Sequence, residues 1–260
     1  DPMGIKAGLT FFVAILLTGL FHQGNWQRVY SAKDTRSMRR GFLLGGLLVA
    51  PFIFVMGLFG LAFMAFTPDG DSSVALFNVI TPVLPTWFVI VLIPLGLSLV
   101  MSSADTAISA IASIIAVDLQ RLRPRTPAQT LRQLSRWLVI VLMIPVFIAS
   151  AQGYSVLYLF LLADLLCSAA AFPVFYGLYS RKISGKTATI STLCGLVAGL
   201  AVFPAPGAAM DYLLESFLLA AMVPVGVTWL ILKSISSNHQ FDLDSLKFKI
   251  RGIDRSADLS

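Results

Sequence analysis

Seven long apolar segments, separated by short polar loops, account for most of this 260-residue chain. An α-helix needs roughly 20 apolar residues to cross the hydrocarbon core of a bilayer, and most of these segments reach that length. A soluble core cannot absorb them, since 57% of the residues are hydrophobic and only 12% are charged. The sequence therefore predicts an all-α membrane protein with about seven transmembrane helices. The predicted segments are residues 5–23, 41–66, 87–117, 131–151, 154–179, 187–205 and 213–232.

The basic residues predict how these helices are oriented. Eighteen of the 19 lysines and arginines lie in or beside the loops after the first, third and fifth segments, or in the tail after the seventh. Cytoplasmic loops carry the excess of Lys and Arg. We therefore expect a multi-pass plasma-membrane protein, with the N-terminus of this chain outside the cell and its C-terminus in the cytoplasm. The net charge of +6 then reflects membrane topology and gives no reason to expect a nucleic-acid partner.

The chain is expected to contain one transmembrane region, residues 1–232, followed by a cytoplasmic tail, residues 233–260. The tail alternates charges with isolated apolar residues, and we expect it to be partly ordered at most. The chain begins at Asp1 with no initiator methionine and no signal peptide, so we interpret it as a fragment. Cys167 and Cys194 lie in apolar segments, where packing is the ordinary role of cysteine.

The first apolar segment is short and irregular. Its apolar run ends at Phe21 and is interrupted by His22, Gln23 and Gly24. A short span with a glycine and polar side chains in its path is typical of a discontinuous transporter helix, whose freed backbone groups can bind solute. His22 and Gln23 are therefore candidate solute contacts, with a structural role for the histidine as the alternative.

The third segment carries a polar stripe on an otherwise apolar helix. Asp105 is the only charge between residues 87 and 117, and an ionised carboxylate in hydrocarbon is costly enough that it normally faces a protein interior. We interpret the stripe as part of a cation site, although serines in membrane helices often bond back to their own backbone and Asp105 can be purely structural. The stripe consists of Ser102, Asp105, Thr106, Ser109 and Ser113.

A second carboxylate, Asp164, lies within the fifth segment. It can face a solute cavity, or it can hydrogen-bond to a neighbouring helix as a structural group.

Three stretches resemble the sodium/solute symporter family. Gln27, Arg28, Ala32 and Lys33 match a pattern that leads from a broken helix into a cytoplasmic loop in that family. Residues 99–105 resemble its sodium-binding helix and 115–119 the cytoplasmic end of that helix, while 172–181 resemble a proline-containing helix end before a basic loop. The resemblance covers essentially residues 5–232.

This resemblance implies a leucine-transporter-like inverted-repeat fold. The first five segments would be the second repeat, the last two would be appended helices, and the first repeat of the same polypeptide would be missing. It also implies that Ser102 and Ser103 bind the coupling ion, Na⁺, with the carbonyl of Leu99 as a third ligand and Asp105 as a further candidate. Neutral oxygens suit this hard cation.

The resemblance also bears on the solute. Sugar carriers of the family place an aromatic gate just before the break, where this chain has Thr18 and Gly19. This departure argues against a sugar and leaves the small-molecule solute open. The candidate solute contacts are Thr18, Gly19, His22, Gln23 and Asp164.

Enzyme classes fit these residues poorly. An intramembrane aspartyl protease needs paired carboxylates, and a serine hydrolase needs a base beside its nucleophile. Neither arrangement is indicated by this sequence. We therefore expect a sodium-coupled secondary transporter that takes up a small polar organic solute by alternating access. The alternative is a transporter-like sensor module of a signalling protein.

Overall fold

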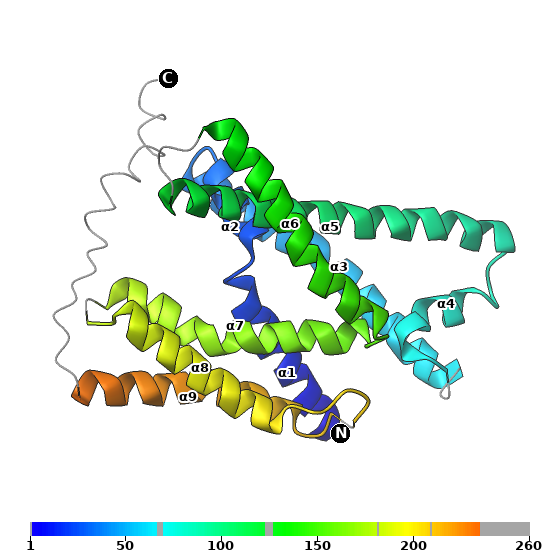
Figure 1. Ribbon diagram of the computed structural model, residues 1–260. Coiled ribbons are helices and arrows are strands. Elements are labelled where there is room, and N and C mark those ends of the chain that lie inside the picture. The colour runs from blue at the N-terminus through cyan, green and yellow to red at the C-terminus, as the bar shows by residue number, and fades with distance from the viewer. Residues whose placement is uncertain (1, 67–69, 123–126, 181, 209, 235–260) are drawn as a thin grey trace. The chain divides into compact units, whose positions relative to one another are not determined.

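The computed structural model describes residues 2–66, 70–122, 127–180, 182–208 and 210–234 (Figure 1). Within these ranges the chain is helical and contains no β-strand. Six of the described helices are long and apolar enough to cross a membrane, and the number is seven when one bent helix pair is counted as a single span. The prediction of an all-α membrane protein with about seven spans is therefore confirmed. The proposed tail, residues 233–260, lies outside the described residues except for the end of the last helix.

The helices follow the predicted apolar segments closely, and several extend into the polar flanks. The first segment is divided into two helices, and one short helix after a 3₁₀ turn, α4, was not anticipated from the sequence. The helices are α1 (Pro2–Gly19), α2 (Gln23–Ser31), α3 (Thr35–Phe66), α4 (Ala75–Ile80), α5 (Thr86–Leu122), α6 (Ala128–Ala151), α7 (Val156–Tyr179), α8 (Gly185–Val202) and α9 (Leu213–Ser234).

The chain divides into two compact units, residues 1–25 with 154–260 and residues 26–153, and each is described by itself. In the first unit α7 and α9 contact each other, and each also contacts α1 and α8. Apolar side chains of α1, α7 and α9 form the core that fixes this arrangement. The core residues are Ala14, Leu161, Leu165, Ala169, Leu213, Phe217 and Ala220.

Small residues bring α8 and α9 into close contact. A Cβ atom at Gly195 would collide with the ring of Pro224 and the carbonyl oxygen of Ala220. The Ser216 hydroxyl donates a hydrogen bond to the carbonyl of Gly199 at 2.8 Å. Membrane helices gain little from hydrophobic transfer when they associate in lipid, so close backbone approach and such hydrogen bonds hold the pair together.

Replacing Gly195 with Ala should therefore lower the stability of the full-length protein. The added methyl group forces α8 and α9 apart, and overpacking of this kind costs about 1–3 kcal/mol. Thermal unfolding of the purified protein in detergent measures the loss. Gly226→Ala on α9 is the matched control, because a Cβ there meets no atom within 4 Å. An equal loss in both variants would contradict the packing argument.

The second unit contains the rest of α2, and α3 to α6. Asp34 caps the start of α3, where its Oδ1 accepts a hydrogen bond of 2.6 Å from the backbone N–H of Ser37. Hydrogen bonds from the backbone and side chain of Ser37 lower the pKa of Asp34, because they stabilise the ionised carboxylate. In this unit α3 contacts α4 and α5 contacts α6. The most apolar stretch of α5 contains no buried residue, so this unit leaves long helix faces uncovered.

Candidate functional site

The first span is broken between α1 and α2, which meet at a bend of 51°. The break occupies residues 20–22, slightly earlier than the polar run from His22 suggested. The N–H of Phe21 donates to the carbonyl of Thr18 at 2.9 Å, and the side-chain amide of Asn25 donates to the carbonyl of Gly19 at 3.4 Å. The prediction of a discontinuous first helix is confirmed, and the carboxyl end of α1 lies at the break.

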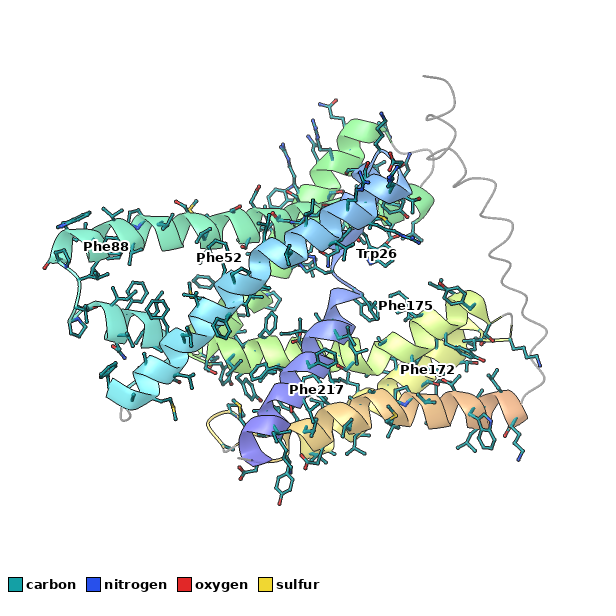
Figure 2. All side chains as sticks on the ribbon, turned by 180° about the vertical axis from the view of Figure 1, so that it is seen from behind. Trp26, Phe52, Phe88, Phe172, Phe175 and Phe217 are labelled. Atoms are coloured by element: carbon teal, nitrogen blue, oxygen red, sulfur yellow. The ribbon has the colours of Figure 1, made fainter. Side chains whose placement is uncertain are left out.

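Aromatic packing holds this break against α7. The ring of Phe21 meets that of Phe175, which is labelled in Figure 2, edge to face with centroids 5.4 Å apart. His22 is exposed, Gln23 is half-buried and Gly19 ends α1. The candidate solute contacts Gly19, His22 and Gln23 are therefore neighbours at one bend, with two different degrees of exposure.

Thr18 and Asp164 are brought together, although they are far apart in the sequence. Thr18, in the last turn of α1, lies beside Asp164 and Cys167 of α7. Asp164 is 1% exposed, which makes it the most deeply buried acidic side chain among the described residues. No hydrogen bond of good geometry satisfies Thr18 Oγ1 or Asp164 Oδ2 within this part of the chain. Two buried oxygens that approach each other without forming a well-shaped hydrogen bond are costly in a membrane helix pair, and they are a candidate for function.

Cys167 is the neighbour that sequence reasoning missed, since it was given a packing role only. It is a free, half-buried thiol one turn after Asp164. Its position on the same face of α7 follows from the three-residue spacing, but its proximity to Thr18 depends on how α1 packs on α7.

The sodium candidates lie on α5, in the second unit. Leu99, Ser102, Ser103 and Asp105 are all exposed within this unit. The Ser103 hydroxyl donates to the carbonyl of Leu99 at 3.0 Å, and the hydroxyl of Thr106 donates to the carbonyl of Ser102 at 2.9 Å. Leu99, Ser102 and Ser103 lie within about a third of the circumference of α5, whereas Asp105 points well away from Ser103. Among the described residues, no other helix covers these candidates. Their role as a sodium site stays a prediction.

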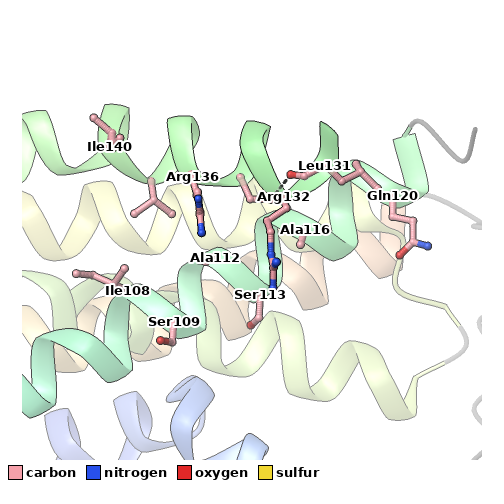
Figure 3. A pocket seen from close by; sticks show the side chains of 12 residues that line it. Ile108, Ser109, Ala112, Ser113, Ala116, Gln120, Leu131, Arg132, Arg136 and Ile140 are labelled. Atoms are coloured by element: carbon pink, nitrogen blue, oxygen red, sulfur yellow. Dashed lines mark hydrogen bonds between the residues drawn. The ribbon is translucent and has the colours of Figure 1, made fainter. Parts of the chain in front are cut away.

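The C-terminal part of the polar stripe lines a groove of about 920 Å³ between α5 and α6 (Figure 3). Ser109 and Ser113 contribute from α5, and Arg132 and Arg136 extend toward the groove from α6. The arginines entered the sequence analysis only as topology signals, although their four-residue spacing already placed them on one helix face. Two guanidinium groups repel cations, so this groove is a poor route for sodium.

The described residues contain no cluster of three or more His, Cys, Asp or Glu side chains that could hold a metal ion. Sodium does not require such a cluster, because hydroxyl and carbonyl oxygens with few carboxylates are adequate ligands for a monovalent cation.

Comparison with known proteins identifies the family. The family model of the sodium:solute symporter family matches residues 4–195, which include the broken first span, the serine pair and Asp164. No curated protein and no solved structure was found to match the chain. The match covers well over half of the sequence, and the chain belongs to the sodium:solute symporter family.

Proposed function

We propose that the protein couples sodium entry to the uptake of a small polar organic solute by alternating access. The observation that carries this proposal is the family match over residues 4–195. The bend between α1 and α2 supports it, because discontinuous helices supply the backbone groups that bind solutes and ions in secondary transporters. The buried, incompletely satisfied Asp164 beside this bend supports a functional centre within the span.

For the sodium site, we propose Ser102, Ser103 and the carbonyl of Leu99, with Asp105 contributing to the local field. The hydrogen bond from Ser103 to Leu99 is compatible with this role. A hydroxyl that donates its hydrogen keeps lone pairs for a cation. The Leu99 carbonyl also accepts the helical N–H of Ser103, so it can bind a cation only when the Ser103 hydroxyl turns away.

The exposure of this face supports a second proposal, that a first repeat of the same polypeptide covers α5. Asp105 and both serines are uncovered within the described unit. A bilayer cannot solvate a carboxylate at this depth, so protein must cover the face in the working transporter. An inverted first repeat would bring the remaining sodium ligands to this face.

For the solute, we propose contacts at the break by Gly19, His22 and Gln23, with Thr18 and Asp164 beneath them. The oxygens of Thr18 and Asp164 are closed to water while α1 packs on α7. Direct contact between the solute and this pair therefore requires α1 to move, as alternating access provides.

The proposal is tested by solute uptake into liposomes that contain the full-length protein. One member of a panel of sugars, amino acids, carboxylates and vitamins should accumulate inside the liposomes under an inward sodium gradient. An equal potassium gradient should not support accumulation. Solute binding without uptake under either gradient would favour the sensor alternative and overturn the transport proposal.

The orientation is a further proposal, with the start of α1 outside and the end of α9 in the cytoplasm. Single cysteines at Ser72 and Ser180, in a protein with Cys167 and Cys194 replaced by Ala, should react from opposite sides of a sealed cell. Ser72 should react with an impermeant maleimide in intact cells, and Ser180 only after permeabilisation. Reaction of both from the same side would contradict the seven-span topology.

A further inference from the structure

Asp164, beside Thr18, is a buried carboxyl group whose ionised form would lack a compensating charge among the described residues. Asp164 follows the first residue of α7 by eight positions, which places it about 12 Å along the helix and inside the hydrocarbon layer. Its side chain is 1% exposed, and the helices that contact α7 are α1, α8 and α9 of the same unit. An ionised carboxylate in such a place requires a cation or a full set of hydrogen-bond donors.

No basic side chain is among the described groups that act on Asp164. Lys182 and Lys186 lie in the α7–α8 connection and in the first turn of α8. Lys6 lies twelve residues before Thr18, at the other end of α1, and its ammonium pairs with Glu215 at 2.8 Å. Lys233, at the end of α9, lies over the ring of Trp229. Thr18 is the neighbour that interacts with the Asp164 carboxylate in the described structure, and it is uncharged.

The groups around this pair are suitable ligands for a small monovalent cation. Asp164 supplies one carboxylate oxygen and Thr18 one hydroxyl oxygen, and neither is committed to a hydrogen bond of good geometry within the described residues. Thr18 is in the last turn of α1, where the helix dipole is negative. The carbonyl oxygens of Thr18 and Gly19 accept bonds from Phe21 and Asn25 and each have a second lone pair. Carboxyl ends of half-helices are used in this way to coordinate coupling ions in transporters. A single carboxylate among neutral oxygens suits a monovalent ion better than a divalent one.

We propose that Thr18 and Asp164 hold a second sodium ion between α1 and α7, separate from the proposed site at Ser102 and Ser103. The ion neutralises the Asp164 carboxylate and attaches the carboxyl end of α1 to α7. Both oxygens are closed to water in the described conformation, so the ion is occluded there and is exchanged when α1 moves away from α7. Sodium binding is then coupled to the position of the half-helix that borders the solute contacts. The link to transport rests on the proposed function, but the binding itself does not.

The test isolates this ion by removing the other proposed site. The full-length protein carrying Ser102→Ala and Ser103→Ala is purified into nanodiscs, and its thermal unfolding is followed in sodium chloride and in choline chloride of equal ionic strength. Sodium at ten times its dissociation constant should raise the Tm of this protein by about 3 °C. Adding Asp164→Asn should increase the sodium concentration needed for half of this shift by about tenfold or more, because a charged ligand is lost.

Two further variants keep the result decisive. Thr18→Val should weaken the sodium response and Thr18→Ser should restore it, even where Asp164→Asn reduces folding yield. Ser168→Ala is the matched control, since Ser168 is equally buried on the same helix and its hydroxyl donates only to the backbone carbonyl of Asp164. It should leave the sodium response unchanged.

Three results would overturn the proposal. The first is a sodium response that persists in both Asp164→Asn and Thr18→Val. The second is an equal loss in Ser168→Ala, which would indicate altered packing rather than a lost ligand. The third is a Tm that does not respond to sodium but does respond to pH, with the pH response lost in Asp164→Asn. This result would show that Asp164 binds a proton instead of sodium. These measurements use no solute, so their outcome does not depend on whether the protein carries out sodium-driven uptake.

Discussion

Replacing both Ser102 and Ser103 with Ala should raise the sodium concentration for half-maximal uptake by about 30-fold. Each substitution removes one oxygen ligand, and a loss of about 1 kcal/mol at each position multiplies to this factor. Maximal uptake at saturating sodium should fall much less, because the solute contacts at the break are unchanged. The measurement is initial uptake into liposomes over a range of external sodium concentrations at constant ionic strength.

Ser98→Ala is the matched control for this prediction. Ser98 lies on the same helix, is exposed like the serine pair, and also donates a hydrogen bond to its own backbone, at 2.7 Å to the carbonyl of Pro94. If back-bonding of serines to α5 were all that mattered, Ser98→Ala and the double variant would change uptake equally. Unchanged sodium dependence in the double variant would remove the serine pair from the sodium site.

The spans could be predicted from the sequence because the bilayer imposes a length on each apolar segment. Residues 213–232 were predicted as the last span, and α9 covers Leu213–Ser234. The broken first helix was also predictable, since His22 to Gly24 interrupt an apolar run that is too short for a span. The exact position of the break could not be predicted, because Leu20 and Phe21 are residue types that also occur in helices. In the structure the helix ends before them, and the N–H of Phe21 forms a turn with the carbonyl of Thr18.

The neighbours within the candidate site could not be predicted to the same degree. Asp164 and Thr18 were each proposed as solute contacts, but their proximity depends on how α1 packs against α7. Hydropathy is nearly uniform around α7, so no apolar face of the sequence indicated which side carries α1. Burial also separates the two intramembrane aspartates, since Asp164 is enclosed in its unit while Asp105 is exposed in its own.

The exposed serine pair and the enclosed Asp164 support different roles for the two units. Asp164 on α7 is buried in the described structure, whereas the most apolar stretch of α5 contains no buried residue. A site at Ser102 and Ser103 therefore depends on protein beyond the described helices. The pair of Thr18 and Asp164 depends mainly on the core that holds α1 and α9 against α7.

Phe217→Ala should be the most destabilising single substitution in that core, lowering the free energy of unfolding by about 3 kcal/mol. Phe217, labelled in Figure 2, is fully buried on α9. It packs in a cluster with Ala14 of α1 and with Leu161 and Leu165 of α7. Truncation leaves a cavity whose walls lose their dispersion contacts, a loss that lipid cannot restore because it does not reach the site. Denaturant unfolding of the full-length protein in mixed micelles measures the change.

The same helix supplies the control that separates cavity formation from a general loss of apolar surface. Met222 on α9 is 62% exposed, and we expect Met222→Ala to change the free energy of unfolding by less than about 0.5 kcal/mol. Since Phe217 supports the contact that encloses Asp164, Phe217→Ala should also weaken the proposed sodium-dependent rise in Tm, whereas Met222→Ala should not. Equal destabilisation by the two variants would show that α9 does not pack against α1 and α7 through Phe217. A large loss of stability with an intact sodium response would show that sodium binding at Thr18 and Asp164 does not depend on this core.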